Sequence, residues 1–234
     1  MGFQELEVLL SDNHTNDIQS TSRRDEIDPI FKFVLTFGFG QLNIPLQTQV
    51  EVSRLPRTMD ALAVLKRKAE REKVKDNTPF HYFRVYNQIE FKGKSDRLTI
   101  AGLRLILGRA NLYMGENKIP VSKMTVTIIC ACKPRQVLLH SQSEVSWKSL
   151  GAGYYCSTDK LPVNLIVTNE MDITPKNYPL LMFTSSKRKF REFLRDAIKS
   201  NSATYVEFAY LVEPEIVEEV TMDSKFNLPQ KNLE

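Results

Sequence analysis

The sequence predicts an α/β fold: a central mixed sheet flanked by helices, in the order helix, three strands, helix, strand. Three observations lead to this prediction. A buried-helix pattern precedes three strand-like runs, an amphipathic helical pattern follows the third run, and a further apolar run follows that helix. A strand that comes directly after a helix suits a crossover connection, which joins parallel strands.

The first predicted helix covers residues 30–39, which are apolar enough to be buried. Asp28 is its candidate N-cap, and Pro29 would occupy the first helical position. Gly38 and Gly40 mark the exit from this helix, because glycine interrupts helical patterns.

Three runs have the composition of strands: residues 48–55, 58–65 and 82–91. A turn at residues 56–57 joins the first two runs. In the third run, alternation places Ile89 and Phe91 on one side of the strand. Glu90 and Lys92 then project together from the other side.

Thr99 can cap the second helix, which is predicted to run to about Met114. Its apolar positions follow the spacing of a core-facing helix: Ile100, Leu103, Leu107 and Ala110. The strand after it covers residues 124–132, and the mixed-charge residues 66–75 indicate a solvated helix or loop. The later predicted elements are a short helix at 135–140, strands at 153–156 and 163–168, and a helix at 185–199.

The helix predicted at residues 185–199 is amphipathic and basic, with Phe190 and Phe193 on its apolar face. Basic residues occupy much of the remaining surface, among them Lys187, Arg188 and Arg191. One interpretation is a surface helix that packs through its apolar stripe. The alternative is a helix whose basic side chains contact phosphates.

The length of 234 residues and the hydrophobic content of 42% predict one domain with tails. The predicted division is a flexible polar lead-in at residues 1–28, a single domain at 29–220 and a tail at 221–234. The net charge of +4 suits a partner made of phosphates, although many proteins without such partners share it.

The three cysteines indicate neither a disulfide framework nor a zinc site, because Cys130 and Cys132 lack nearby histidines. The apolar runs are too short to span a membrane, and residues 1–26 lack the features of a secretion signal. We therefore expect a cytoplasmic protein with no membrane partner.

Two acids and a lysine form the one constellation that suggests chemistry. Glu90 and Lys92 share a strand face, and Asp60 opens a preceding strand that would lie about 4.8 Å away if the two are paired. Carboxylates so placed can share Mg²⁺, and a lysine can steady an attacking water or a developing negative charge. The alternative is a Glu–Lys pair on a solvated strand face.

Three segments carry a resemblance: residues 55–62 (Leu-Pro-Arg-Thr-Met-Asp-Ala-Leu), 86–92 (Tyr-Asn-Gln-Ile-Glu-Phe-Lys) and 95–99 (Ser-Asp-Arg-Leu-Thr). They resemble the PD-(D/E)XK nuclease superfamily, and within it restriction-endonuclease-like proteins of bacteria, common in cyanobacteria. The similarity continues through residues 153–155, 165–170 and 177–181, and so covers most of the region 29–220.

The resemblance implies a restriction-endonuclease-like core, with Asp60 and Glu90 as ligands of Mg²⁺ or Mn²⁺ and Lys92 as the catalytic lysine. Members of the superfamily often add another acid. Glu51 is the first choice for it, with Asp28 and Glu26 as runners-up. The proline of the superfamily name is absent beside Asp60, at a position that varies in the superfamily.

Arg104 and Arg109 follow the motif on the next helix and could reach phosphates near the site, or could be ordinary surface arginines. Trp147 is interpreted as a packing residue.

The expected function is metal-dependent endonuclease cleavage of phosphodiester bonds, with DNA as the expected nucleic-acid partner. Cutting both strands of a duplex with one site per chain would favour a homodimer. The alternative is a catalytically inactive protein of the same fold that binds nucleic acid or a partner protein.

Overall fold

The computed structural model describes residues 23–51, 58–141, 145–157 and 159–224 of the chain. Side chains are not described at 23–27, 49–51 and 223–224. The helices and strands are, in chain order, α2 (Arg23–Gln41), β1 (Leu46–Glu51), β2 (Thr58–Val64), α3 (Lys68–Asn77), β3 (Tyr86–Lys92), α4 (Ile100–Glu116), η1 (Val121–Lys123), β4 (Met124–Cys130), α5 (Arg135–His140), β5 (Trp147–Gly151), β6 (Tyr154–Ser157), β7 (Val163–Val167), η2 (Thr168–Glu170), η3 (Pro175–Asn177), α6 (Tyr178–Leu181), α7 (Lys187–Lys199), α8 (Ala203–Val212) and α9 (Pro214–Ser224).

The protein is an α/β structure built on a seven-stranded mixed sheet in the order β1-β2-β3-β4-β7-β6-β5. Parallel pairing joins β3 to β4 and β4 to β7, whereas the outer strands pair antiparallel. The crossover predicted from the helix that precedes β4 is confirmed, because α4 connects the parallel strands β3 and β4.

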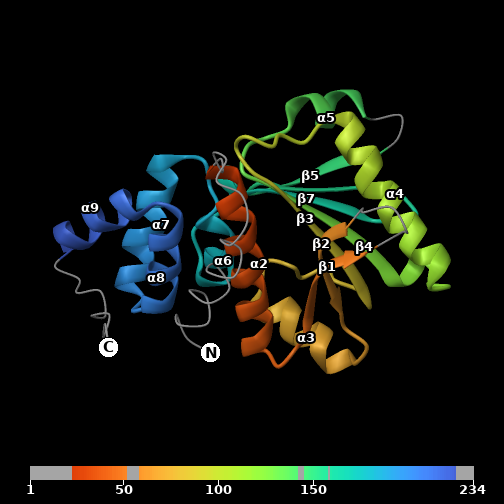
Figure 1. Ribbon diagram of the computed structural model, residues 1–234, viewed down its shortest axis with the longest axis horizontal. Coiled ribbons are helices and arrows are strands. Elements are labelled where there is room, and N and C mark those ends of the chain that lie inside the picture. The colour runs from red at the N-terminus through yellow and green to blue at the C-terminus, as the bar shows by residue number, and fades with distance from the viewer. Residues whose placement is uncertain (1–22, 52–57, 142–144, 158, 225–234) are drawn as a thin grey trace, which may run out of the picture.

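Helices cover both faces of the sheet (Figure 1). One core lies between the sheet and α2 together with α6 to α9, and the other lies between the sheet and α4 with α5. All seven residues of β4 are buried, as expected of a central parallel strand with helices on both sides. Each strand in the middle of the sheet therefore presents side chains to two different apolar layers.

The first helix begins earlier than the sequence predicts, at Arg23. Asp28 is therefore not an N-cap, and Pro29 lies inside the helix rather than at its first position. Ile30 and Phe31 are buried directly after the proline, so burial of this stretch favours helix despite the cost of an internal proline.

The helix also continues past Gly38 and Gly40 and ends at Gln41. Its end is marked instead by Asn43, which adopts a left-handed backbone with φ of 56°. Asparagine tolerates this conformation better than most residues, which makes it a suitable helix terminator.

Several predicted elements are confirmed with shifted ends. The third strand begins at Tyr86 rather than Tyr82, because the side chain of Asn87 accepts a hydrogen bond from the amide of Arg84 and forms a turn there. Residues 68–77 form the solvated helix α3, in which only Val74 is buried. Part of the first predicted strand and the turn at 56–57 lie outside the described residues.

The helix predicted after Thr99 is confirmed, with the Thr99 hydroxyl accepting a hydrogen bond from the amide of Gly102 at 3.0 Å. Trp147 packs beside the α4 core, as predicted, and its indole donates to Ser141 at 2.9 Å. The sequence analysis missed β5, α6, α8 and α9. The three cysteines are free. No described helix has the length and apolarity needed to cross a membrane.

Candidate functional site

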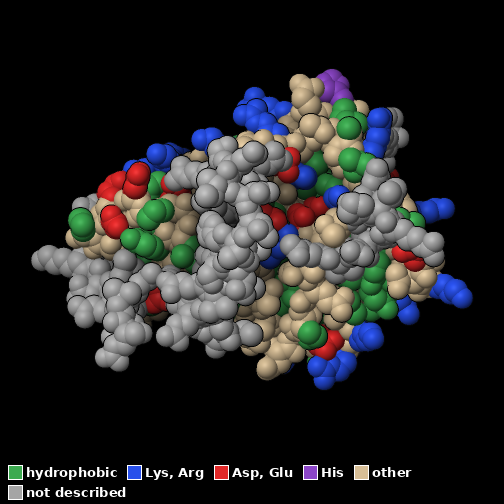
Figure 2. Space-filling view, viewed as in Figure 1, with side chains coloured by type: hydrophobic (Ala, Val, Ile, Leu, Met, Phe, Trp, Pro, Cys, Tyr) green, Lys and Arg blue, Asp and Glu red, His purple; other side chains and the backbone are tan. Residues whose placement is uncertain are grey.

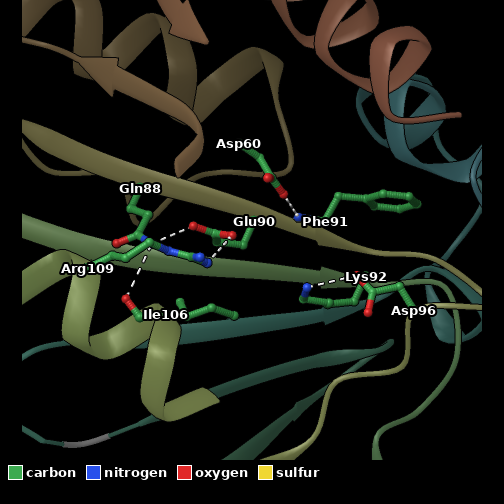
Figure 3. A network of polar contacts seen from close by, with 8 residues as sticks. All are labelled: Asp60, Gln88, Glu90, Phe91, Lys92, Asp96, Ile106 and Arg109. Atoms are coloured by element: carbon green, nitrogen blue, oxygen red, sulfur yellow. Dashed lines mark hydrogen bonds and ion pairs between the residues drawn. The ribbon is translucent and has the colours of Figure 1, made fainter. Parts of the chain in front are cut away.

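The site lies where strands β2 and β3 stop pairing. Their antiparallel ladder ends at the pair Ala61 and Ile89, and the same register would next place Asp60 opposite Glu90. Instead of continuing the ladder, the Asp60 carboxylate accepts a hydrogen bond from the amide of Phe91 at 2.8 Å. The side chain thus takes the place of a backbone partner and fixes Asp60 beside the end of β3 (Figure 3).

Glu90 is buried on the α4 side of β3, with 1% of its surface exposed. Arg109 of α4 donates to one of its carboxylate oxygens at 2.7 Å, and Gln88 donates to the other at 2.7 Å (Figure 3). The Gln88 amide also approaches the carbonyl of Ile106 at 3.4 Å. The carboxylate is therefore held from its own strand and from the helix above it.

The two carboxylates are electrostatically linked. Burial and the charge of Asp60 together raise the pKa of Glu90 to about 7, against the opposing effects of Arg109, Gln88 and Lys92. Burial also raises the pKa of Asp60, although the Phe91 amide lowers it. Ionising both acids without an added cation is thus disfavoured.

Lys92 follows on the same face of β3. Its ammonium group bonds to Asp96 at 2.9 Å in the loop before α4, and about 20% of its side chain is exposed. The positive charge of Lys92 lowers the pKa of both Asp60 and Glu90. The structure therefore brings the predicted acid, acid and lysine into one electrostatic neighbourhood.

A cavity of about 790 Å³ opens beside this group at the carboxyl end of β3. Asp60 and Lys92 line it, while Glu90 lies deeper in the protein. The remaining walls come from the first half of α2, the end of β3 and the loop after it, the residue after β4, the segment leading into α7 and the end of α8: Asp28, Pro29, Phe91, Gly93, Lys94, Ser95, Asp96, Arg97, Ala131, Phe183, Thr184, Ser185, Lys187, Val212 and Glu213. In the space-filling view, acidic and basic side chains lie together in a recess near the middle of the face (Figure 2).

Of the three candidates for a third acid, Asp28 is the one whose side chain the structure describes. Glu51 ends β1, and its side chain, like that of Glu26, lies outside the described residues. Asp28 lines the cavity, pairs with Lys32, and its charge raises the pKa of Asp60.

The predicted phosphate-binding arginines are differently engaged. Arg109 forms an ion pair with the buried Glu90, so it holds this carboxylate in place and is not free to bind a phosphate. Arg104 is exposed on α4. On α7, Arg191 makes two hydrogen bonds to Glu219, at 2.8 and 2.7 Å, and Arg188 lies 3.6 Å from Glu192. Among the predicted contacts on α7, Lys187 is the one that lines the cavity.

Sequence reasoning missed Gln88 and Asp96, which bond to Glu90 and Lys92. Gln88 carried a usable signal, since it precedes Glu90 by two positions and so shares its strand face. Asp96 carried none beyond its place in the turn after the strand.

The described residues contain no group of three or more His, Cys, Asp or Glu side chains placed to hold a metal ion. Two carboxylates do fit the donor set that Mg²⁺ takes from proteins, which is commonly one or two carboxylates with water and substrate oxygens. One Asp60 oxygen accepts from Phe91, and the two Glu90 oxygens accept from Gln88 and Arg109. Carboxylate oxygens have further lone pairs, so these bonds do not exhaust the capacity of the two acids to bind a cation.

In comparisons with protein-family models, curated proteins and solved structures, the chain matches none of them.

Proposed function

We propose that the protein is a Mg²⁺- or Mn²⁺-dependent endonuclease that hydrolyses phosphodiester bonds, with DNA as its substrate and a restriction-endonuclease-like core. The observation that carries the proposal is the pair of the half-buried Asp60 and the buried Glu90, two acids with raised pKa values that lie beside Lys92 where the pairing of β2 with β3 ends. Acids with perturbed pKa values beside a cleft are candidate functional groups. The succession α2, β1, β2, β3, α4, β4 agrees with the core that the resemblance implies, with α3 inserted before β3.

A bound divalent cation would supply charge neutralisation and a water of lowered pKa. Asp60 and Glu90 are the side chains that would hold it, and the charge of Asp28 acts on Asp60. Lys92 would place its ammonium group against the substrate phosphate or the attacking water, on exchange of its bond to Asp96.

Gln88 and Arg109 would act through Glu90 rather than on the substrate. Their donors fix the rotamer of a carboxylate that burial would otherwise drive toward the neutral form. Such supporting contacts orient metal ligands and keep them basic.

A second candidate function is a catalytically inactive protein that binds nucleic acid. A specific observation favours it: Glu90 already pairs with Arg109, and Lys92 with Asp96, so these ion pairs neutralise both residues without a cation. Cleavage and binding measured on the same preparation separate the two candidates.

The test uses the full chain with supercoiled DNA, linear duplex, single-stranded DNA and RNA, in Mg²⁺, Mn²⁺ or EDTA. Asp60→Asn, Glu90→Gln and Lys92→Ala are each expected to abolish metal-dependent cleavage. Glu72→Gln, at an exposed acid on α3, is the matched control and should cut as the unaltered protein does. Cleavage retained by all three site variants would disprove the proposal, and binding without any cleavage would select the inactive alternative.

A further inference from the structure

Exposed basic side chains line the cavity beside its acids. Three exposed basic residues line the cavity: Lys94, Arg97 and Lys187. Within the described part of the chain, no ion pair is found for any of them. Arg188 and Arg191, which do not line the cavity, pair with acids. Three positive charges without an ion pair among the described residues therefore line the cavity, and the charge of Lys187 also lowers the pKa of Glu219.

These three residues come from two separate walls. Lys94 and Arg97 belong to the loop between β3 and α4, directly after Lys92, and Lys187 is the first residue of α7. A ligand that entered between the walls would meet positive charge on both sides.

The acids that line the cavity differ from one another in their bonding partners. Four described acids line it: Asp28, Asp60, Asp96 and Glu213. Asp28 pairs with Lys32 and Asp96 with Lys92, whereas Asp60 accepts a hydrogen bond from a neutral amide and has a raised pKa. The negative charge of Asp60, which repels other anions, therefore lies beside Lys94, Arg97 and Lys187, for which no ion pair is found among the described residues. A phosphodiester accompanied by a divalent cation suits this pattern, because the cation would satisfy the acids while flanking phosphates meet the basic residues.

At the start of α7, the group available to a ligand is the charged side chain of Lys187, because several backbone amides there already donate hydrogen bonds within the protein. The amides of Ser185 and Ser186 donate to the side chain of Asn169, and the amide of Lys189 donates to the Ser186 hydroxyl. Lys187 is consequently held in place by a loop whose polar groups are already bonded.

We propose that Lys94, Arg97 and Lys187 form a clamp that binds backbone phosphates of a nucleic-acid strand on both sides of the bond next to Asp60. This inference rests on the proposed function, because the bound strand is taken to present its scissile bond to Asp60. Its affinity for phosphates does not require that the protein cut. An acidic peptide is the less favoured ligand, because its carboxylates would bring negative charge to Asp60 without a divalent cation.

The experiment measures binding of fluorescent duplex and single-stranded DNA by anisotropy across a series of salt concentrations, in EDTA and again with Mg²⁺ on the Lys92→Ala background, which is expected not to cut. The triple variant Lys94→Ala, Arg97→Ala, Lys187→Ala should lose about tenfold or more in affinity at low salt. The slope of log affinity against log salt should fall by about 0.9 for each duplex phosphate contact removed.

The matched control removes the same charge at the opposite end of the sheet: Lys66→Ala, Lys118→Ala, Lys123→Ala, all at exposed lysines. This control should keep most of the affinity, and the charge-conserving variant Lys94→Arg, Arg97→Lys, Lys187→Arg should keep it as well. Equal loss in both alanine triples would show a general charge effect and overturn the clamp. Unchanged binding in the first triple would also overturn it.

Two further outcomes separate the clamp from the proposed function. If Asp60→Asn cuts normally while the clamp triple fails to bind, the nuclease site is wrong and the clamp stands. If Asp60→Asn stops cleavage while the clamp triple binds and cuts normally, the clamp alone is wrong. Poly-glutamate of matched charge that binds as tightly as DNA would contradict the assignment to nucleic acid.

Discussion

The two ends of the parallel strands β3 and β4 carry cavities of comparable size, and the acids beside them have pKa values shifted in opposite directions. At the amino end, about 600 Å³ is lined by residues that include Glu70, Arg67, Tyr86 and Tyr113. Glu70 bonds to the Arg67 side chain at 2.7 Å and to its amide at 2.9 Å, and these bonds lower the pKa of Glu70. At the carboxyl end, Asp60 and Glu90 instead have raised pKa values.

The difference shows what each acid does for the protein. Glu70 completes a capping box at the start of α3, so its charge stabilises local structure. Burial disfavours ionisation of Asp60 and Glu90, an arrangement that local folding does not require. Open α/β sheets commonly bind ligands at the carboxyl ends of their strands. In this protein, that end carries the two acids with raised pKa values.

Breaking the ion pair at each end should give the largest contrast. Arg109→Ala leaves Glu90 buried without its cation and should lower the free energy of unfolding by about 3–5 kcal/mol. Arg67→Ala removes a pair whose arginine is 75% exposed, and should cost no more than about 1 kcal/mol. Urea denaturation measures both values, and equal losses would mean that the two pairs are not energetically different.

The raised pKa of Glu90 should appear as a pH dependence of stability. The folded protein retains a proton on Glu90 up to a pKa of about 7, whereas the unfolded chain releases it near the ordinary value of 4.5. Stability from this group is therefore complete below about pH 4.5 and is lost as the pH rises through 7.

Glu90→Gln lacks this proton, so its free energy of unfolding should fall less between pH 5 and pH 8 than that of the unaltered protein. Glu70→Gln is the control from the other end and should preserve the fall. Parallel pH profiles for Glu90→Gln and the unaltered protein would show that Glu90 is ionised throughout.

The smallest expected effect concerns the N-cap of α4. Thr99 caps α4 through one hydrogen bond to the amide of Gly102, and Thr99→Ala should lower the free energy of unfolding by about 1 kcal/mol. Thr99→Ser keeps the hydroxyl and should recover most of that loss. A full loss in the serine variant would assign the effect to packing of the methyl group instead.

The convergence of Asp60, Glu90 and Lys92 could be predicted because it depends on strand periodicity and on the pairing of neighbouring strands. The pairing of Glu90 with Arg109 could not, because it depends on how α4 lies across the sheet. The position of Asp28 inside α2 could not be predicted either, because proline is common at the first position of a helix and Pro29 therefore suggested that the helix begins there.

The outer parts of the fold illustrate a second limit. Strand β5 has mostly exposed residues, so no alternation of apolar and polar positions marks it. Helix α8 is apolar around much of its surface and lacks the amphipathic period that identified α7. Neither gap affected the order of the central elements, whose patterns are set by burial on one or both faces.

The central claim is that Asp60 and Glu90 together hold one divalent cation. Calorimetric titration of the full chain with Mn²⁺ tests it directly, without dependence on substrate or cleavage. We expect one site per chain, lost in Asp60→Asn, weakened in Glu90→Gln and unchanged in Glu70→Gln. Binding of equal strength in Asp60→Asn, or no binding by the unaltered protein, would contradict the claim.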